Sequence, residues 1–162
     1  IGDKMKKYIY AFVILHYGEA KMTIDCVNNL LDKIKDEKSA IIVVDNNSPL
    51  QTGKQVDGEF ESKNNVFFIY NKKNLGFANG NNVGYKFAKD VLNSEYICVM
   101  NNDVFILQEN FWEDQSVLVT YTHILFDFVC NNFSPYFFIL SSRNLSRIIN
   151  KQRTYVTIPS TT

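Results

Sequence analysis

The sequence predicts an α/β protein with a Rossmann-like, mostly parallel sheet flanked by helices. Apolar, β-rich runs alternate along the chain with stretches of helical periodicity, and polar clusters follow the apolar runs. Strands that alternate with helices pair in parallel through right-handed crossovers. Ligands bind such sheets at the carboxyl ends of the strands, so we expect the polar clusters to line one binding edge.

The expected elements follow one another in regular order. Residues 8–15 form a continuous apolar run, which is typical of a strand buried on both faces. Residues 23–34 repeat apolar side chains at helical spacing and predict a helix. Three further strands are expected at residues 40–44, 66–70 and 96–100, and a second long helix at residues 77–92.

Length and composition indicate about one globular domain without a nucleic-acid partner. The 162 residues are 46% apolar, which is enough for a real core, and the formal net charge is zero. A neutral chain offers no general electrostatic attraction to nucleic acid. Because Cys26, Cys98 and Cys130 are scattered without a CxxC pair, we expect buried thiols in a reducing, cytoplasmic compartment.

The most informative segment is residues 74–84, which read Asn-Leu-Gly-Phe-Ala-Asn-Gly-Asn-Asn-Val-Gly. Gly76, Gly80 and Gly84 are spaced by four, which puts a bare stripe on one face of a helix. The start of this helix, surrounded by asparagine amides, is suited to attract an anionic phosphate. Glycines at this spacing also occur where a helix packs closely on a sheet, and both interpretations stay open.

Two carboxylates stand out among the polar clusters that follow the apolar runs. Asp45 follows residues 40–44 and is equally suited to accept from a base or ribose and to cap a turn. Asp103 follows residues 96–100, where we expect it to face the glycine-rich helix. A carboxylate placed in this way could hold a divalent ion that bridges a diphosphate.

The order of these motifs resembles the family 2 glycosyltransferases, and most closely their rhamnosyltransferase-like branch. The likeness rests on residues 12–17, 44–48, 74–84 and 100–103, and it covers residues 7–111. It implies the nucleotide-binding half of a GT-A fold and inverting transfer of a sugar from a UDP- or dTDP-linked donor to a glycan or lipid-linked acceptor. It also implies Mg²⁺ or Mn²⁺ as the cofactor, bound through the last acid of a D-x-D motif.

The resemblance assigns roles to individual residues. Asp45 is expected at the base or ribose, residues 74–79 around the donor, and Asp103 on the metal ion. The predicted nucleotide-sugar site consists of His16, Tyr17, Glu19, Asp45, Asn47, Asn74, Gly76, Phe77, Asn79, Asn102 and Asp103.

Two positions depart from the family pattern. Asn101 occupies the first position of the D-x-D motif, so metal binding rests on Asp103 together with the diphosphate oxygens. Gly18 stands where the family usually has asparagine, which removes a local hydrogen bond rather than the site.

The catalytic base is not assigned by the sequence. Inverting transfer needs a base that takes the proton of the acceptor hydroxyl, and the family supplies it from an acid downstream of the metal motif. The carboxylates beyond Asp103 are Glu109, Glu113, Asp114 and Asp127, and none has that context. An alternative therefore stays open, namely a truncated, non-catalytic module that binds a nucleotide sugar without transferring it.

The chain divides into a nucleotide-sugar-binding domain, residues 1–111, and an atypical apolar and basic tail, residues 112–162. Residues 116–140 have the length of a membrane span but are interrupted by polar side chains, Asp127 among them. The tail is open to three interpretations: a membrane-associating segment, buried strands that complete the sheet, or a truncated end. The resemblance implies polysaccharide assembly at the inner face of the cell membrane, with peripheral membrane association. An incomplete sheet edge and an apolar tail also favour a homo-oligomer.

Overall fold

The sheet at the centre of the fold has the strand order β3-β2-β1-β4-β5. The computed structural model describes residues 8–34, 38–106 and 138–141. The strands are β1 (Tyr10–His16), β2 (Ser39–Asp45), β3 (Val66–Tyr70), β4 (Tyr96–Asn101) and β5 (Phe138–Ser141). Strands β1 to β4 run parallel, and β5 pairs antiparallel with β4. The predicted Rossmann-like α/β class is confirmed.

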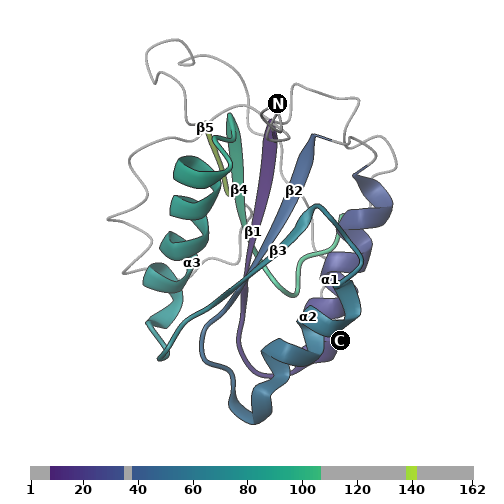
Figure 1. The fold of residues 1–162 in the computed structure, drawn as a ribbon, viewed down its shortest axis with the longest axis vertical. Coiled ribbons are helices and arrows are strands. Elements are labelled where there is room, and N and C mark those ends of the chain that lie inside the picture. The colour runs from purple at the N-terminus through teal and green to yellow at the C-terminus, as the bar shows by residue number, and fades with distance from the viewer. Residues whose placement is uncertain (1–7, 35–37, 107–137, 142–162) are drawn as a thin grey trace, which may run out of the picture.

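Helices cover both faces of this sheet. They are α1 (Ala20–Lys33), the 3-10 turn η1 (Pro49–Gln51), α2 (Thr52–Phe60), α3 (Gly76–Lys86) and the π-helical turn η2 (Phe87–Val91). Helices α1 and α2 lie on one face and α3 lies on the other (Figure 1). The carboxyl ends of the four parallel strands lie at one edge of the sheet, which is the lower edge in Figure 1.

Strands β1 and β2 form the buried centre of the sheet, as their continuous apolar runs predict. Residues 11–16 and all of β2 are buried. Successive side chains of a strand point to opposite faces. Accordingly, Phe12 and Ile14 belong to the apolar cluster that includes α1, whereas Val13 and Val44 belong to the cluster beneath α3.

Two helical segments differ from the prediction. Helix α2 was not expected, because its nine residues include two glycines and bury only two large apolar side chains, Val56 and Phe60. Packing in the cluster that also contains α1 residues stabilises it, a contribution that local periodicity does not reveal. The long helix expected at residues 77–92 is α-helical only as far as Lys86, the end of α3. It continues as the π turn η2, after which Leu92 N–H donates to Phe87 O at 3.1 Å.

One segment of the tail adds to the sheet. Strand β5 pairs with β4, so that Val99 lies opposite Phe138 and Tyr96 opposite Ser141. The interpretation of the tail as strands that complete the sheet therefore holds for residues 138–141, while the rest of the tail lies outside the described residues. In the part of the chain that the structure describes, no helix combines the length and apolar character needed to cross a membrane.

The glycine stripe of α3 packs against the sheet. A methyl group added at Gly80 would lie 2.5 Å from Leu15 Cδ1, and one added at Gly84 would overlap Val13 and Val44. The glycines therefore let the helix approach β1 and β2 closely. Of the two interpretations of the stripe, close packing is the one observed for Gly80 and Gly84.

This close approach leads to a stability prediction for Gly84→Ala. We expect the free energy of unfolding to fall by about 1–2 kcal/mol, because overpacking against two stiff valines outweighs the better helix propensity of alanine. Gly58→Ala is the matched control, since a methyl group at this helical position meets no atom within 4 Å. The control is expected to gain about 0.5–1 kcal/mol. Denaturant titration compares the two variants, and equal stability would show that α3 is not held closely against the sheet.

Candidate functional site

The carboxyl edge of the sheet brings together the polar residues that follow the strands. In the sheet register His16 pairs with Asp45, Asp45 with Tyr70, and Leu15 with Asn101. From β1 the chain proceeds outward to β2 and β3 and then returns to β4 on the other side of β1. Ligands of open α/β sheets bind outside the strand ends at such a reversal of strand order. The predicted site residues thus surround the position where this fold class binds ligands.

Asp45 ends β2 and combines a structural contact with a free oxygen atom. Its side chain is 8% exposed, and its Oδ1 accepts the N–H of Ser48 at 3.0 Å. The turn cap, one of the two roles considered for Asp45, is therefore present. No described residue forms a hydrogen bond with Oδ2, which remains able to accept one from a ligand. Gly53 of α2 lies directly against this carboxylate, where any side chain would overlap it.

His16, a predicted ligand contact, is buried and connects β1 to both α1 and α2. Its Nδ1 lies 2.7 Å from Thr23 Oγ1, and its Nε2 lies 3.1 Å from Thr52 Oγ1. Thr52 donates its single proton to Pro49 O at 3.3 Å, so it accepts from His16 Nε2–H. Thr23 accepts from Asn102 Nδ2 at 2.9 Å and donates to His16 Nδ1. Because both ring nitrogens of the neutral imidazole are hydrogen-bonded, His16 holds the start of α1 and the start of α2 in place beside β1.

The buried imidazole also makes the stability of the protein depend on pH. Burial lowers the pKa of His16 below its ordinary value of 6.5, although the nearby Asp45 carboxylate raises it in part. The unfolded chain therefore gains the proton at a higher pH than the folded chain. As the pH falls from 6.5 toward the folded-state pKa, we expect the free energy of unfolding to decrease by up to about 1.4 kcal/mol per pH unit.

Denaturant titrations from about pH 7.5 to about pH 5 measure this dependence. His16→Gln keeps a polar side chain but does not titrate in this range, so the variant should lack this part of the slope. Subtracting the pH dependence of His16→Gln from that of the wild type cancels the contribution of every other titrating group. The same slope in both proteins would contradict the assignment to His16.

Asn46 directly follows β2 and organises the loop between β3 and α3, although it was not among the predicted site residues. Its side chain is buried. Its Nδ2 donates to Asn74 Oδ1 at 2.9 Å and to Gly76 O at 3.3 Å. Its Oδ1 accepts from Asn71 Nδ2 at 3.1 Å and from Leu75 N–H at 3.0 Å. One buried amide thus fixes the loop that leads into the glycine-rich helix.

The start of α3 presents several predicted site residues at this edge. Gly76 has a φ of +75°, a left-handed conformation that favours glycine, and Asn74 Oδ1 accepts its N–H at 2.8 Å. Asn79 Nδ2 donates to Leu75 O at 3.3 Å. The ring of Phe77 is 51% exposed. All four predicted residues of this segment are exposed.

The remaining predicted contacts lie in the loops that follow β1 and β2. Tyr17 and Glu19 are exposed between β1 and α1. Asn47 is exposed between β2 and η1 and has a φ of +60°, which asparagine adopts more readily than most residues. These side chains are at the correct edge of the sheet to border a ligand.

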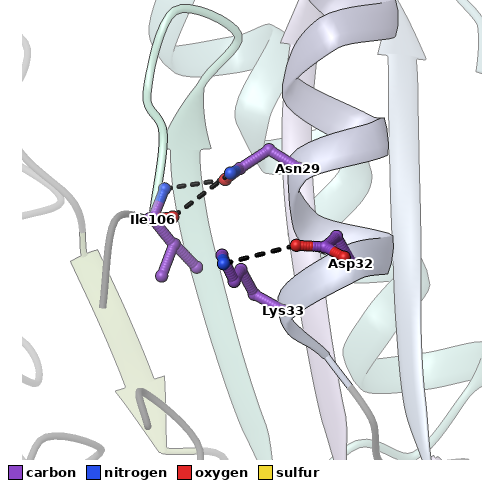
Figure 2. A network of polar contacts seen from close by, with 4 residues as sticks. All are labelled: Asn29, Asp32, Lys33 and Ile106. Atoms are coloured by element: carbon purple, nitrogen blue, oxygen red, sulfur yellow. Dashed lines mark hydrogen bonds and ion pairs between the residues drawn. The ribbon is translucent and has the colours of Figure 1, made fainter. Parts of the chain in front are cut away.

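The segment that carries Asp103 is fastened to α1. Asn102 donates to Thr23, and Asn29 binds both backbone groups of Ile106 (Figure 2). Asn29 Nδ2 donates to Ile106 O at 3.2 Å, and Asn29 Oδ1 accepts the Ile106 N–H at 2.7 Å. The segment that follows β4 is therefore held by α1, which covers the face of the sheet opposite α3. The paired residues are 77 to 79 positions apart, so local sequence patterns do not reveal these contacts.

The Asp103 carboxylate suits a divalent cation that a second ligand helps to hold. It is exposed, and no hydrogen bond or ion pair engages it within residues 8–34 and 38–106. Among the described residues, no group of three or more His, Cys, Asp and Glu side chains could hold a metal ion. A carboxylate is the type of ligand that Mg²⁺ and Mn²⁺ prefer, and a cation held by Asp103 would need further oxygen ligands.

Two of the three thiols confirm the expectation of buried cysteines. Cys26 and Cys98 are free and buried, and Cys130 lies outside the described residues. Burial, with a contribution from the charge of Asp103, raises the pKa of Cys26 to about 12. Burial likewise raises the pKa of Cys98 well above its ordinary value. Both thiols are therefore protonated near neutral pH.

Four parallel strands, helices on both faces and a polar carboxyl edge define a Rossmann-like α/β domain. The sequence profile of Glycosyl transferase family 2 matches residues 11–139. The chain belongs to glycosyl transferase family 2. No curated protein matches the chain.

The fold is shared with solved GT-A structures. The mannosyltransferase PcManGT from Pyrobaculum calidifontis, in complex with GDP-Man and Mn²⁺, is similar with a TM-score of 0.56 at 17% identity, over 67% of this chain and 31% of that protein. Residues 1–349 of TarS from S. aureus, in complex with UDP-GlcNAc, are similar with a TM-score of 0.56 at 21% identity, over 67% of this chain and 30% of that fragment. The chain thus spans about a third of the length of each of these two solved chains. At these identities the likeness establishes the common GT-A fold.

Proposed function

We propose that this chain binds a nucleoside diphosphate sugar together with Mg²⁺ or Mn²⁺ and forms the donor-binding part of an inverting glycosyltransferase. The observation that carries the proposal is the placement of two carboxylates at one edge of a parallel sheet, with Asp45 at the end of β2 and Asp103 just after β4. Membership of glycosyl transferase family 2 supports it. So do the complexes of the structural neighbours with GDP-Man and Mn²⁺ and with UDP-GlcNAc.

Each part of such a donor has a suitable chemical group at this edge. Asp45 Oδ2 can accept from the imide N–H of a uracil or thymine ring or from a ribose hydroxyl. Asn74 and Asn79 border the sugar and the phosphates. Asp103 holds the cation, which offsets the charge that develops on the leaving diphosphate. UDP- and dTDP-linked sugars are the donors that the rhamnosyltransferase-like motifs favour.

Transfer also requires a base at the acceptor hydroxyl. The downstream acids Glu109, Glu113, Asp114 and Asp127 lie outside the described residues, and none has the sequence context of the base of the family. This observation favours a second candidate function for the chain as it stands, namely binding of the nucleotide sugar without transfer. Release of the nucleotide product from a sugar donor that binds distinguishes catalysis from binding alone.

The resemblance also supports a cellular setting. We propose a glycan or a lipid-linked carrier as the acceptor, with assembly of a surface polysaccharide at the inner face of the cell membrane. Peripheral membrane association and a homo-oligomer belong to the same proposal. Sedimentation tests both. Without vesicles, the sedimentation rate of the protein reports self-association, and with vesicles, the fraction of protein that sediments with them reports membrane association.

The decisive experiment is calorimetric titration of UDP, dTDP and GDP into the purified chain, each with and without Mn²⁺. We expect one nucleotide to bind in the presence of Mn²⁺ and to bind at least roughly tenfold more weakly without it, as a cation shared with the diphosphate requires. This result would also identify the base that the site prefers. If a folded chain binds none of the three nucleotides, the proposed function is wrong.

A further inference from the structure

One face of α1 carries three polar side chains that hold the segment from Asn101 to Ile106. They are Thr23, Cys26 and Asn29, spaced by three residues, so they lie on neighbouring turns of one helix face. Thr23 binds the Asn102 side chain at 2.9 Å, and Asn29 binds Ile106 at both backbone groups.

Cys26 lies between these two contacts and adds weaker ones. Its thiol is 3.4 Å from Val104 O and 3.8 Å from Asn101 O. Because burial keeps the pKa of this thiol high, its proton stays available for donation. The three side chains together form what we term the α1 clamp: Thr23, Cys26 and Asn29.

The side chains of the segment held by the α1 clamp alternate between exposed and buried positions. Asp103 and Phe105 are exposed, whereas Val104 and Ile106 are each 5% exposed and pack in the cluster that contains α1. With this alternation, a shift of the segment by one residue would turn Asp103 inward and Val104 outward. Apolar packing already disfavours this shift, because it would bury the Asp103 carboxylate and expose Val104 and Ile106. The hydrogen bonds to the two backbone groups of Ile106 add directional contacts that hold the same arrangement.

We propose that Thr23 and Asn29, supported by Cys26, are positioning residues that hold Asp103 in place for the divalent cation. This inference rests on the proposed function, in which Asp103 is the cation ligand. The Asp103 carboxylate makes no bond of its own within the described residues, so its position depends on the fixed neighbours before and after it. Partners that orient a metal ligand without touching the metal typically contribute tenfold to 100-fold in affinity.

Thr23 also joins the α1 clamp to the other side of the site. Its hydroxyl accepts from Asn102 and donates to His16, whose other ring nitrogen donates to Thr52 at the start of α2. A single line of hydrogen bonds thus runs from the Asp103 segment to the helix that packs against Asp45. Loss of the Thr23 hydroxyl therefore affects both carboxylates, whereas loss of the Asn29 amide affects only the Asp103 side.

The test uses two pairs of variants of the full chain. Asn29→Ala removes both bonds to Ile106, and Asn28→Ala is its control, because Asn28 is exposed on the same helix. Thr23→Val removes the hydroxyl at nearly constant volume, and Thr23→Ser restores it. We measure Mn²⁺ affinity by electron paramagnetic resonance in the presence of whichever of UDP, dTDP and GDP binds the wild type.

For Asn29→Ala and Thr23→Val we expect the Mn²⁺ dissociation constant to rise roughly tenfold, with Asn28→Ala and Thr23→Ser within about twofold of the wild type. For Asn29→Ala, nucleotide affinity without metal should stay within about twofold, because the Asp45 side is untouched. Hydrogen exchange without any ligand supplies a second readout. The Ile106 amide should exchange faster in Asn29→Ala than in Asn28→Ala, because its acceptor is lost.

The outcomes separate the inference from the proposed function. If Asp103→Ala abolishes Mn²⁺ binding while folded Asn29→Ala and Thr23→Val bind Mn²⁺ like the wild type, the positioning role is wrong and the proposed function stands. If the wild type itself shows no metal-dependent nucleotide binding, the proposed function fails and the role toward the cation fails with it. Unchanged exchange of the Ile106 amide in Asn29→Ala would overturn the α1 clamp itself. A Thr23→Val variant that does not fold leaves the decision to Asn29→Ala.

Discussion

Replacement of Asp103 by asparagine is expected to abolish Mn²⁺-dependent nucleotide binding while the fold stays intact. Asparagine keeps the size of the side chain and removes the negative charge that the proposed site offers to the cation. We expect the Mn²⁺ dissociation constant of the nucleotide complex to rise by roughly 100-fold or more, since even indirect partners of metal ligands contribute up to about that factor. Thermal unfolding should be unchanged, because the carboxylate is exposed and makes no bond in the described part of the chain.

Titration of Mn²⁺ into the nucleotide-saturated protein measures this loss. Asp90→Asn is the matched control, because Asp90 is equally exposed but belongs to η2, which precedes β4 at the opposite edge of the sheet. The control should bind Mn²⁺ like the wild type. Equal Mn²⁺ affinities of the two variants would contradict Asp103 as the cation ligand, whatever nucleotide the site prefers.

Replacement of Asn46 by alanine is expected to have the largest effect on stability. The substitution leaves Asn71 Nδ2 and the N–H of Leu75 without their acceptor, and Asn74 Oδ1 without one of its donors. Because unsatisfied groups of this kind cost about 1–3 kcal/mol each, we expect a loss of about 2–3 kcal/mol in the free energy of unfolding, partly relieved by water. The loop into α3 should also lose its fixed shape, so nucleotide affinity should fall in the variant that remains folded.

Denaturant titration and hydrogen exchange measure these two effects. The Leu75 amide is expected to exchange faster in Asn46→Ala, because its acceptor is the Asn46 side chain. Asn64→Ala is the control, since Asn64 is exposed and the bond it makes to Tyr8 uses its backbone oxygen. The control should stay within about 0.5 kcal/mol of the wild type. A loss in Asn46→Ala no larger than in the control would show that water replaces the amide without cost.

The strands were predictable because each is a run of apolar residues too long and too uniform for a surface segment. The predicted run at residues 66–70 matches β3, and the others differ from the observed strands by only one or two residues at their ends. Helix α2 was not predictable from its periodicity, because its stability comes from contact with the cluster that includes α1. The glycine stripe was found in the sequence, but only its contacts with Val13 and Leu15 show that the glycines serve packing.

The site was predictable to the extent that its residues follow strands. Asp45 directly follows one apolar run, Asp103 follows another after two asparagines, and parallel strands carry such positions to one edge. The alternation of β2 could have predicted that Asn46 faces α3, because Val44, two residues earlier, faces that helix. Because Asn46 and Asn47 are adjacent and chemically identical, their polarity did not indicate which of the two is buried.

The sequence by itself determined the α/β class, the order of the strands along the chain, the edge of the sheet where the predicted site residues lie, and the family. These features depend on periodicity and on short motifs, which are local properties of the chain. Only the tertiary structure decided that the segment carrying Asp103 is hydrogen-bonded to α1, that His16 lies between two threonines, and that Asn46 fixes the loop before α3. Each of these depends on hydrogen bonds between distant residues, whose direction is set by how the helices pack on the sheet and leaves no periodic trace in the sequence.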